Sequence, residues 1–217
     1  MRRPDLPVRF IRERRNALRT LAAALLVPAA PAIAQPPPLA LTPSQPEGPF
    51  YPKAAPDDRD WDLTRIAGRG GQASGTPLYF SGRVLGRDSR PFINASVELW
   101  QCDVHGRYHN AGDEGLPRDD NFQGYGVVTT DAEGRYAFKT IRPVRYSGRT
   151  PHLHVRLRSA GGTTLTTQIY IAGDRADGDF VLAATPREAR ERLTMTLAPA
   201  AGREEGALSG NFDFVLA

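Results

Sequence analysis

The chain has 217 residues, 40% of them hydrophobic, which is enough for one domain with a substantial core. Its formal net charge is +4, but residues 1–34 hold seven of the 28 basic and two of the 24 acidic residues, which leaves 21 and 22 in the remainder. A near-neutral remainder lacks the basic stripe of a nucleic-acid-binding protein. The single cysteine, Cys102, excludes an intrachain disulfide or a cysteine-based zinc cluster.

Residues 1–34 have the composition of an export signal. An arginine-rich stretch is followed by the apolar run LAAALLVPAAPAIA, which ends in the A-x-A pattern of Ala32–Ala34. The motif RRNALR, residues 14–19, is similar to a twin-arginine signal, although an alanine replaces the usual phenylalanine. We therefore expect export to the periplasm in a folded state, a route that often carries proteins with a metal or cofactor already bound. Two prolines interrupt the short apolar run, so a permanent membrane anchor is the weaker alternative.

The remainder of the chain has the pattern of an all-β domain. Residues 35–41, QPPPLAL, predict a proline-rich linker, and the domain is expected over residues 42–217. Its first segment, TPSQPEGPFYP over residues 42–52, contains four prolines and predicts a loop or extended arm. Short alternating segments between turn residues then predict an antiparallel β-sandwich or barrel. These segments cover residues 78–85, 95–102, 124–130, 135–141, 152–158, 163–171, 193–198 and 211–217.

Two local signals refine this fold. Residues 131–134, DAEG, predict the turn of a hairpin between the alternating segments on either side. Thr185, followed by Pro186 and then by Glu188, predicts a capping box at the start of the one short helix.

The segment RYSGRTPHLHV, residues 145–155, contains a His-x-His pattern inside an expected strand. Alternate side chains share a face, so His152 and His154 point to one side. The apolar residues Leu153, Val155 and Leu157 point to the other side, toward the core. The two imidazoles can hold one metal ion or belong to an ordinary solvated face. Tyr108 lies just past a strand end in VELWQCDVHGRYHN, residues 97–110, where a tyrosine by itself is more typical of rim packing or a solvent-facing hydrogen bond than of function.

The combination of motifs is more specific than its parts. In order and spacing, EGPFYP, VELWQCDVHGRYHN, DAEGRYAFKTIRPVRYSGRTPHLHV and TTQIYIAGD resemble the intradiol ring-cleavage dioxygenases, the family of protocatechuate 3,4-dioxygenase and catechol 1,2-dioxygenase. The resemblance covers residues 42–182 and implies a prealbumin-like β-sandwich. It also implies a non-haem Fe(III) cofactor whose ligands are Tyr108, Tyr146, His152 and His154. Phenolate is a hard donor that favours Fe(III), and imidazole suits several transition metals.

The resemblance further implies an activity and roles for three residues. The expected reaction is cleavage of a catechol-type aromatic by O2 between its hydroxylated carbons, which gives a muconate-type diacid. Tyr146 would be the displaceable ligand that accepts a proton from the substrate. Arg149 would stabilise negative charge on the bound ring, unless it is a surface arginine in a turn. Gln168 would lie beside the substrate and oxygen pocket, unless it is an ordinary strand amide.

Three further residues lie near these motifs. Tyr51 in the arm is expected either at the pocket rim or packed within the arm, and His105 and His109 are not expected to be ligands. The expected partners are a small catechol and O2, with no nucleic acid and, in the mature form, no membrane. A homo-oligomer is left open, but the chain lacks the long N-terminal helical region with which catechol 1,2-dioxygenases dimerise.

One departure from the family concerns substrate preference. Only five residues separate Tyr146 from His152, where the well-known enzymes have a longer loop. A shorter pocket wall leaves fewer groups to reject a substituted ring, so several catechols should be accepted.

Two other classes of function stay open at this point. A sandwich can be a non-catalytic binding protein derived from the family. His-x-His also suits a zinc hydrolase, although such sites normally add a carboxylate or a third imidazole rather than two phenolates.

Overall fold

The computed structural model describes residues 37–109 and 115–217. The predicted export signal and the start of the predicted linker lie outside these residues. The part from Pro37 onward forms one compact unit. Within the described ranges, no helix has the length and apolar character needed to cross a membrane.

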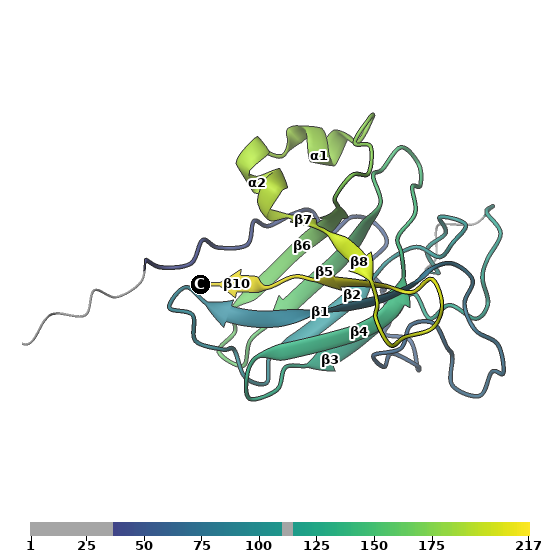
Figure 1. The fold of residues 1–217 in the computed structure, drawn as a ribbon, viewed down its shortest axis with the longest axis horizontal. Coiled ribbons are helices and arrows are strands. Elements are labelled where there is room, and N and C mark those ends of the chain that lie inside the picture. The colour runs from purple at the N-terminus through teal and green to yellow at the C-terminus, as the bar shows by residue number, and fades with distance from the viewer. Residues whose placement is uncertain (1–36, 110–114) are drawn as a thin grey trace, which may run out of the picture. The chain divides into compact units, whose positions relative to one another are not determined.

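The strands form two five-stranded sheets that pack face to face (Figure 1). In the first sheet the order is β10-β1-β9-β8, and β4 also pairs with β1; in the second it is β3-β2-β5-β6-β7. The first sheet comprises β1 (Pro77–Gly86), β4 (Arg135–Ile141), β8 (Leu197–Pro199), β9 (Leu208–Asn211) and β10 (Phe214–Leu216). The second comprises β2 (Ser96–Trp100), β3 (Tyr125–Thr129), β5 (His152–Arg158), β6 (Thr164–Ile171) and β7 (Thr194–Met195).

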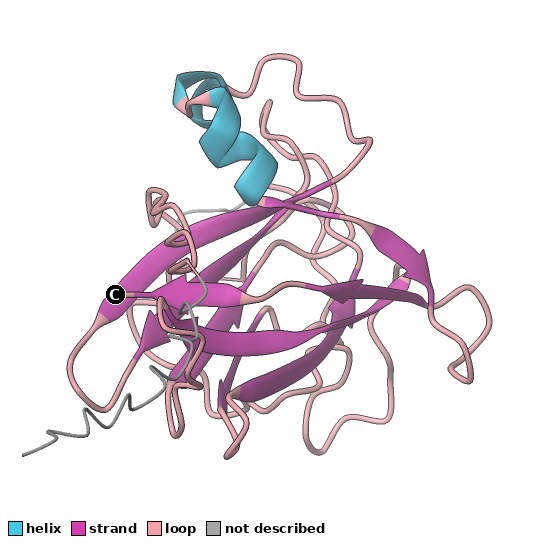
Figure 2. Ribbon diagram, turned by 60° about the vertical axis from the view of Figure 1, so that its left-hand side comes forward, coloured by secondary structure: helices cyan, strands magenta, loops and turns pink. Residues whose placement is uncertain are grey.

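The predicted sandwich is confirmed, but its purely antiparallel character is wrong. Strand β1 pairs in parallel with both β9 and β10, and β6 pairs in parallel with β7. Parallel neighbours need a long connection. Between β6 and β7 that connection contains both helices, which lie together beyond one edge of the second sheet (Figures 1 and 2).

The core between the sheets follows from the alternation along the strands. In β5 the residues Leu153, Val155 and Leu157 are fully buried and face the first sheet, where Phe80 and Phe138 belong to the same apolar cluster. Alternate side chains of a β-strand lie on opposite faces, so these three residues occupy the face of β5 that is turned toward the first sheet. The histidines therefore lie on the outer face of the second sheet.

The predicted hairpin at residues 131–134 is only half right. The turn is present, since the Gly134 N–H donates to the Asp131 carbonyl at 3.0 Å. The flanking strands, however, do not pair with each other: β3 pairs with β2, and β4 pairs with β1. The turn therefore carries the chain from one sheet to the other, which alternation along the sequence does not distinguish from a hairpin.

The predicted capping box is also wrong. The structure has two short helices, α1 (Phe180–Ala184) and α2 (Arg187–Arg192), where one was expected. Pro186 caps α2 without any side-chain hydrogen bond, and Thr185 instead ends α1. The Thr185 hydroxyl donates to the Val181 carbonyl at 2.8 Å and accepts from Gln45 Nε2 at 3.1 Å, and α2 begins after Pro186 rather than after Thr185.

The segment 42–52 forms an irregular arm, as predicted. The Thr42 N–H donates to the Val215 carbonyl on β10, and the Gln45 N–H donates to the Thr166 carbonyl on β6. The Thr167 hydroxyl donates to the Pro43 carbonyl at 2.8 Å. We call residues 42–52 the arm; these bonds lead it across β6 and onto the outer face of the second sheet.

Candidate metal centre

Strand β5 supplies the two histidines. It lies in the middle of the second sheet between β2 and β6, so its outer face is flanked on both sides. His152 and His154 are 2% and 1% exposed. A solvated polar face is therefore excluded for this pair, because buried polar side chains need specific partners.

Tyr108 is delivered by a turn that follows β2. The buried carboxylate of Asp103 accepts hydrogen bonds from the backbone N–H groups of His105 and Arg107, and its Oδ2 lies 3.0 Å from His109 Nε2. Such a turn, in which an Asp side chain binds the backbone ahead of it, fixes the chain direction. Tyr108 leaves this turn with its ring 1% exposed.

Tyr146 is delivered by a second turn, which ends two residues before β5. The Arg149 N–H donates to the Tyr146 carbonyl at 2.7 Å, and the residues between them, Ser147 and Gly148, have φ angles of 42° and 78°. Two positive φ values are the signature of a type I′ turn. This turn accounts for the short spacing between Tyr146 and His152 and places Tyr146 beside Arg149.

The four predicted ligands come together at one point. The two tyrosine hydroxyl oxygens, of Tyr108 and Tyr146, are 3.4 Å apart, and the Nε2 atoms of His152 and His154 are 3.0 Å apart. The Tyr146 ring lies 5.6 Å from the His152 ring, and the Tyr108 ring lies 6.0 Å from the His154 ring. The turns after β2 and before β5 thus face the same two imidazoles.

Both imidazoles are held neutral. Burial lowers the pKa of His152 to about 4 and that of His154 well below its usual value. His152 Nδ1 lies 2.6 Å from the Thr150 carbonyl, so Nδ1 carries the hydrogen and Nε2 presents a lone pair to the site.

The ring of His154 is oriented differently. It stacks on Trp100 with a centroid distance of 4.9 Å and an angle of 13°. Among the residues that the structure describes, its Nδ1 has no hydrogen-bond partner. Packing, rather than a hydrogen bond, therefore sets the direction of its Nε2.

Without a metal the two phenols are protonated, whereas a metal ligand would be a phenolate. Burial raises the pKa of both Tyr108 and Tyr146, although the Tyr108 hydroxyl and the charge of Arg149 partly offset this for Tyr146. Phenolate will form here only when a cation compensates its charge.

The donor set fits a transition-metal ion. Two nitrogens bound to one ion at about 2.1 Å and at right angles would lie about 3.0 Å apart, which is the separation of the two Nε2 atoms. In residues 37–109 and 115–217, the site included, no group of three or more His, Cys, Asp and Glu side chains is placed to hold a metal. The site therefore lacks the carboxylate or third imidazole that a zinc hydrolase would normally use.

Arg149 and Gln168 lie beside this cluster and are both buried. Arg149 Nη2 donates to Gln168 Oε1 at 2.6 Å, and Gln168 Nε2 donates to the Pro46 carbonyl of the arm at 2.7 Å. Gln168 stands opposite His154 across the β5–β6 pair. Burial thus excludes a surface position for Arg149, whereas a role for Gln168 beyond that of a strand amide stays a prediction.

The arm forms the cover of the centre. Phe50 stacks on Tyr108 with centroids 4.5 Å apart at 8°, and a Cβ at Gly48 would lie 3.5 Å from His154 Cε1. Gly48 has φ of 76°, a conformation that other residues rarely adopt. The arm therefore approaches the ligands closely enough to exclude much of the solvent.

The remaining predicted residues take structural positions. Tyr51 packs within the arm against Trp100, and its hydroxyl donates to the buried Glu98 at 2.7 Å. His109 lies against Asp103, and His105 takes part in the same turn.

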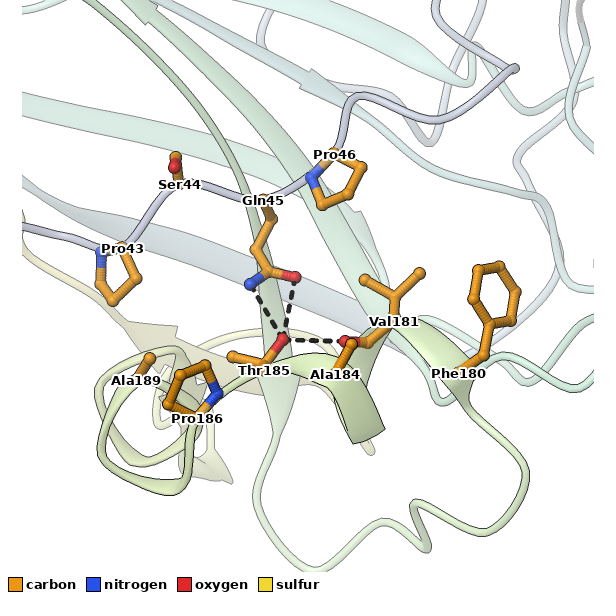
Figure 3. A pocket seen from close by; sticks show the side chains of 10 residues that line it. All are labelled: Pro43, Ser44, Gln45, Pro46, Phe180, Val181, Ala184, Thr185, Pro186 and Ala189. Carbon is orange, nitrogen blue, oxygen red and sulfur yellow. Dashed lines mark hydrogen bonds between the residues drawn. The ribbon is translucent and has the colours of Figure 1, made fainter.

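A groove of about 630 Å3 adjoins the centre (Figure 3). Residues 43–46 of the arm line one side, and residues of α1 and α2 line the other. Gln45 Nε2 donates to the Thr185 hydroxyl at 3.1 Å and ties the two sides together. Pro46 and Phe180 belong both to this groove and to the surroundings of the centre, since the Arg149 guanidinium lies 5.7 Å from the Phe180 ring centroid.

Several residues around the centre were not identified from the sequence. Trp100 and Phe50 stack on predicted ligands, and Asp179 forms a buried ion pair with Arg149. Strand alternation places Trp100 on the same face as Glu98, but its contact with His154 depends on the pairing of β2 with β5. Asp179 before the apolar run FVLAA is an N-cap signal that could have revealed α1, though not its ion pair.

The fold and the centre together define a β-sandwich protein in which two tyrosines and two histidines converge at one buried point. A family model described as Dioxygenase matches residues 46–217. The chain is 38% identical over 167 residues to the protocatechuate 3,4-dioxygenase beta chain of Burkholderia cepacia. The aligned residues cover 72% of this chain and 71% of that protein. The chain is 32% identical over 188 residues to 6-chlorohydroxyquinol 1,2-dioxygenase of Cupriavidus pinatubonensis, covering 78% of this chain and 62% of that one.

A solved structure gives the same result. The dioxygenase domain of a dioxygenase carbohydrate-binding protein fusion from Streptomyces sp. SirexAA-E superposes with a TM-score of 0.63 at 31% identity, covering 82% of this chain and 98% of that domain. The chain belongs to the intradiol ring-cleavage dioxygenase family.

Proposed function

We propose that this protein cleaves small catechols with O2 at a non-haem Fe(III) ion, between the two hydroxylated carbons, to give muconate-type diacids. The observation that carries the proposal is the convergence of two phenol oxygens and two neutral imidazole nitrogens in one buried site. Membership of the family supports the reaction type.

Tyr108, Tyr146, His152 and His154 would hold the iron. When bound, Fe(III) would withdraw electron density from a catecholate and make its ring reactive toward O2. Two phenolates compensate two of the three ferric charges, and a catechol brings further negative charge. The four side chains therefore suit a ferric ion better than they suit a metal ion whose sites normally include carboxylates.

Tyr146 is the better placed of the two phenols to move a proton. It is part-exposed and lies in a short turn, whereas Tyr108 is fully buried and stacked on Phe50. Burial raises the pKa of the Tyr146 phenol, so a proton from the substrate hydroxyl would be retained there once the phenolate is released. Tyr108 stays in place because its ring is packed on several sides.

Arg149 would orient the substrate and stabilise its charge. Its Nε and Nη2 are engaged with Asp179 and Gln168, whereas Nη1 has no hydrogen-bond partner among the described residues. A fixed guanidinium with one free edge is suited to a developing negative charge. Gln168 accepts from Nη2 and is itself fixed by its hydrogen bond to the Pro46 carbonyl of the arm, so the guanidinium cannot turn freely.

Substrate breadth forms the second part of the proposal. The type I′ turn between Tyr146 and Arg149 leaves little chain to form a wall on that side. Named relatives act on protocatechuate and on 6-chlorohydroxyquinol, whose ring substituents differ in charge and size. We expect catechol, 4-methylcatechol, hydroxyquinol and protocatechuate all to be turned over to some degree.

We also propose that the protein is exported to the periplasm through the signal in residues 1–34. The arginine pair, the apolar run and the A-x-A pattern support this. Expression in a Gram-negative host, with and without Arg14→Lys and Arg15→Lys, tests the twin-arginine route: the double substitution should abolish periplasmic accumulation. Unchanged export would contradict that route.

The reaction is tested with iron-loaded protein and the four catechols, with products identified by mass and ultraviolet spectrum. Iron loading should also give a red colour that shifts when a catechol is added. A yellow semialdehyde as the main product would refute the intradiol assignment, and turnover of protocatechuate alone would refute the breadth. Iron binding and a colour shift without any product would favour a non-catalytic binding protein.

A further inference from the structure

One buried carboxylate lies between the candidate metal centre and α1. Asp179 is 1% exposed and is the N-cap residue of α1, where its Oδ1 accepts the Leu182 N–H at 3.0 Å. The same Oδ1 accepts Arg149 Nε at 3.0 Å, and Oδ2 accepts the Thr150 N–H at 2.8 Å. A cap alone needs one of these three bonds.

The three bonds keep the carboxylate charged. Burial by itself would raise the pKa of Asp179, but the backbone donors of Leu182 and Thr150 and the charge of Arg149 lower it overall. Arg149 is 7% exposed and would otherwise be a buried cation with no anionic partner at hand. Each charge therefore depends on the other for its place in the interior.

The first route from Asp179 to the centre runs through Arg149. Asp179 holds Nε, while Gln168 Oε1 holds Nη2 at 2.6 Å and the Tyr170 hydroxyl lies 3.5 Å from the same nitrogen. A guanidinium fixed on two sides keeps its planar fork in one orientation. The free Nη1 edge keeps its direction only while both Asp179 and Gln168 bind the guanidinium.

The second route runs through the backbone of one residue, Thr150. Asp179 binds the N–H of Thr150, and the carbonyl of Thr150 accepts the Nδ1 hydrogen of His152 at 2.6 Å. Groups that accept the free N–H of a metal-binding histidine fix its tautomer and ring direction. The same carboxylate thus restrains both the charged arginine and one predicted ligand.

We infer that Asp179 is a positioning residue, which aligns Arg149 for the substrate and His152 for the metal. This rests on the proposed function for the Arg149 route, whereas the His152 route concerns metal binding alone. The alternative is that Asp179 only caps α1 and stabilises the fold.

The test compares two substitutions at this position with a matched control. Asp179→Ser keeps an N-cap oxygen for Leu182 but loses the charge. Asp179→Asn keeps the shape of the side chain and serves if the serine variant does not fold. Asp177→Asn is the control, because it removes a nearby exposed carboxylate whose side chain pairs with Arg175 and not with Arg149 or Thr150. Each is made with Arg149 present and in an Arg149→Ala background.

Both routes have their own readout. We expect Asp179→Ser to lower kcat by about 10-fold or more with Arg149 present, and by less than about twofold in the Arg149→Ala background. Release of Fe(III) to a chelator, which needs no turnover, should be several-fold faster in both backgrounds. The Asp177→Asn control should match the parent in kcat and in iron release.

Three outcomes would overturn the inference. Retention of kcat and of the iron-release rate would reduce Asp179 to a helix cap. Equal losses of kcat in both backgrounds would show that it does not act through Arg149. Failure of both variants to fold would make it a residue of the fold only. If the parent protein binds iron but cleaves no catechol, the proposed function fails while the iron-release comparison still decides the His152 route.

Discussion

The two faces of the second sheet are both buried, but by different means. The inner face packs Leu153 and Val155 against the first sheet, where only volume and apolarity are required. The outer face packs His152 and His154 beneath the irregular arm, where a hydrogen bond to the Thr150 carbonyl orients His152 and stacking on Trp100 orients His154. The same strand thus carries a generic core on one side and a specified site on the other.

This difference indicates how a function can be added to a sandwich. Inner side chains can be exchanged at a cost in stability alone, because dispersion and burial are not directional. Outer side chains are held by hydrogen bonds and by stacking at fixed angles, so their exchange should change chemistry before it changes the fold. Neighbouring residues of β5 allow the two effects to be separated.

The largest effect is expected for His154→Ala. It removes one of the four predicted metal donors, so iron content should fall to a small fraction of one per chain and turnover should be lost. Iron is measured by a chelator assay and the fold by far-ultraviolet circular dichroism, which should be unchanged.

The matched control is Leu153→Ala on the opposite face. It should cost about 2–5 kcal/mol in the free energy of unfolding, because it leaves a cavity in the core. Iron bound per folded chain should stay normal. A His154→Ala protein with full iron content would show that the predicted ligand set is wrong.

Arg149→Ala should give the next largest effect. Iron and colour should be retained, because the arginine is not a predicted ligand, while kcat should fall by roughly 100-fold with the loss of one preorganised charge. Steady-state turnover of catechol measures this, and Arg145→Ala, in a nearby exposed position, is the control. Full activity in Arg149→Ala would assign the residue to structure alone.

The sequence was sufficient for the parts of this comparison that depend on local pattern. Strands β4 and β5 have the bounds that alternation predicted, and the face of β5 that carries the histidines follows from the same alternation. The missed features depend on which strands pair. The turn at residues 131–134 looks like a hairpin but joins two sheets, and the parallel strands β9 and β10 are set by distant partners.

The site shows the same division. The predicted ligands follow motifs in the sequence, and the structure brings all four together. The residues that orient them come from elsewhere: Trp100 from a neighbouring strand and Asp179 from the start of α1. Their side chains carry no local signal for this role, because the contact exists only after the sheet, the arm and the helix have assembled.

In the iron-free protein, acid should lower the free energy of unfolding through the buried histidines of the outer face. The pKa of His152 is lowered to about 4 in the fold and is about 6.5 in the unfolded chain, so the unfolded state takes up the proton first. Stability is therefore complete above about pH 6.5 and is lost as pH falls toward 4. The loss for this group approaches about 3 kcal/mol.

Urea unfolding between pH 7.5 and 5 measures this loss, and backbone hydrogen bonds help to lower the pKa of the buried Asp103 and Asp179, so these two carboxylates titrate below that range. His154, whose pKa is also lowered by burial, contributes in the same direction. His152→Gln should make the pH dependence shallower. A wild-type stability that does not change over this range would contradict the buried, neutral state of the histidines.

The smallest effect is expected at the edge of the outer face, where the arm is anchored. Tyr51→Phe removes a hydroxyl that donates to the buried Glu98, while Tyr125 still donates to the same oxygen at 3.2 Å and Arg158 lies 3.6 Å from the other. Because Glu98 keeps two partners, we expect a loss of only about 1 kcal/mol in unfolding free energy, with iron and kcat within twofold.

The control for this last change is Tyr79→Phe on the first sheet. Its hydroxyl also donates to a glutamate, Glu204, at 2.7 Å, but at the exposed surface and far along the chain from the arm. Water can replace that bond, so the loss should be smaller still. A Tyr51→Phe protein that loses iron would show that the arm's anchor, and not only its contacts at Phe50 and Gly48, determines the geometry of the ligands.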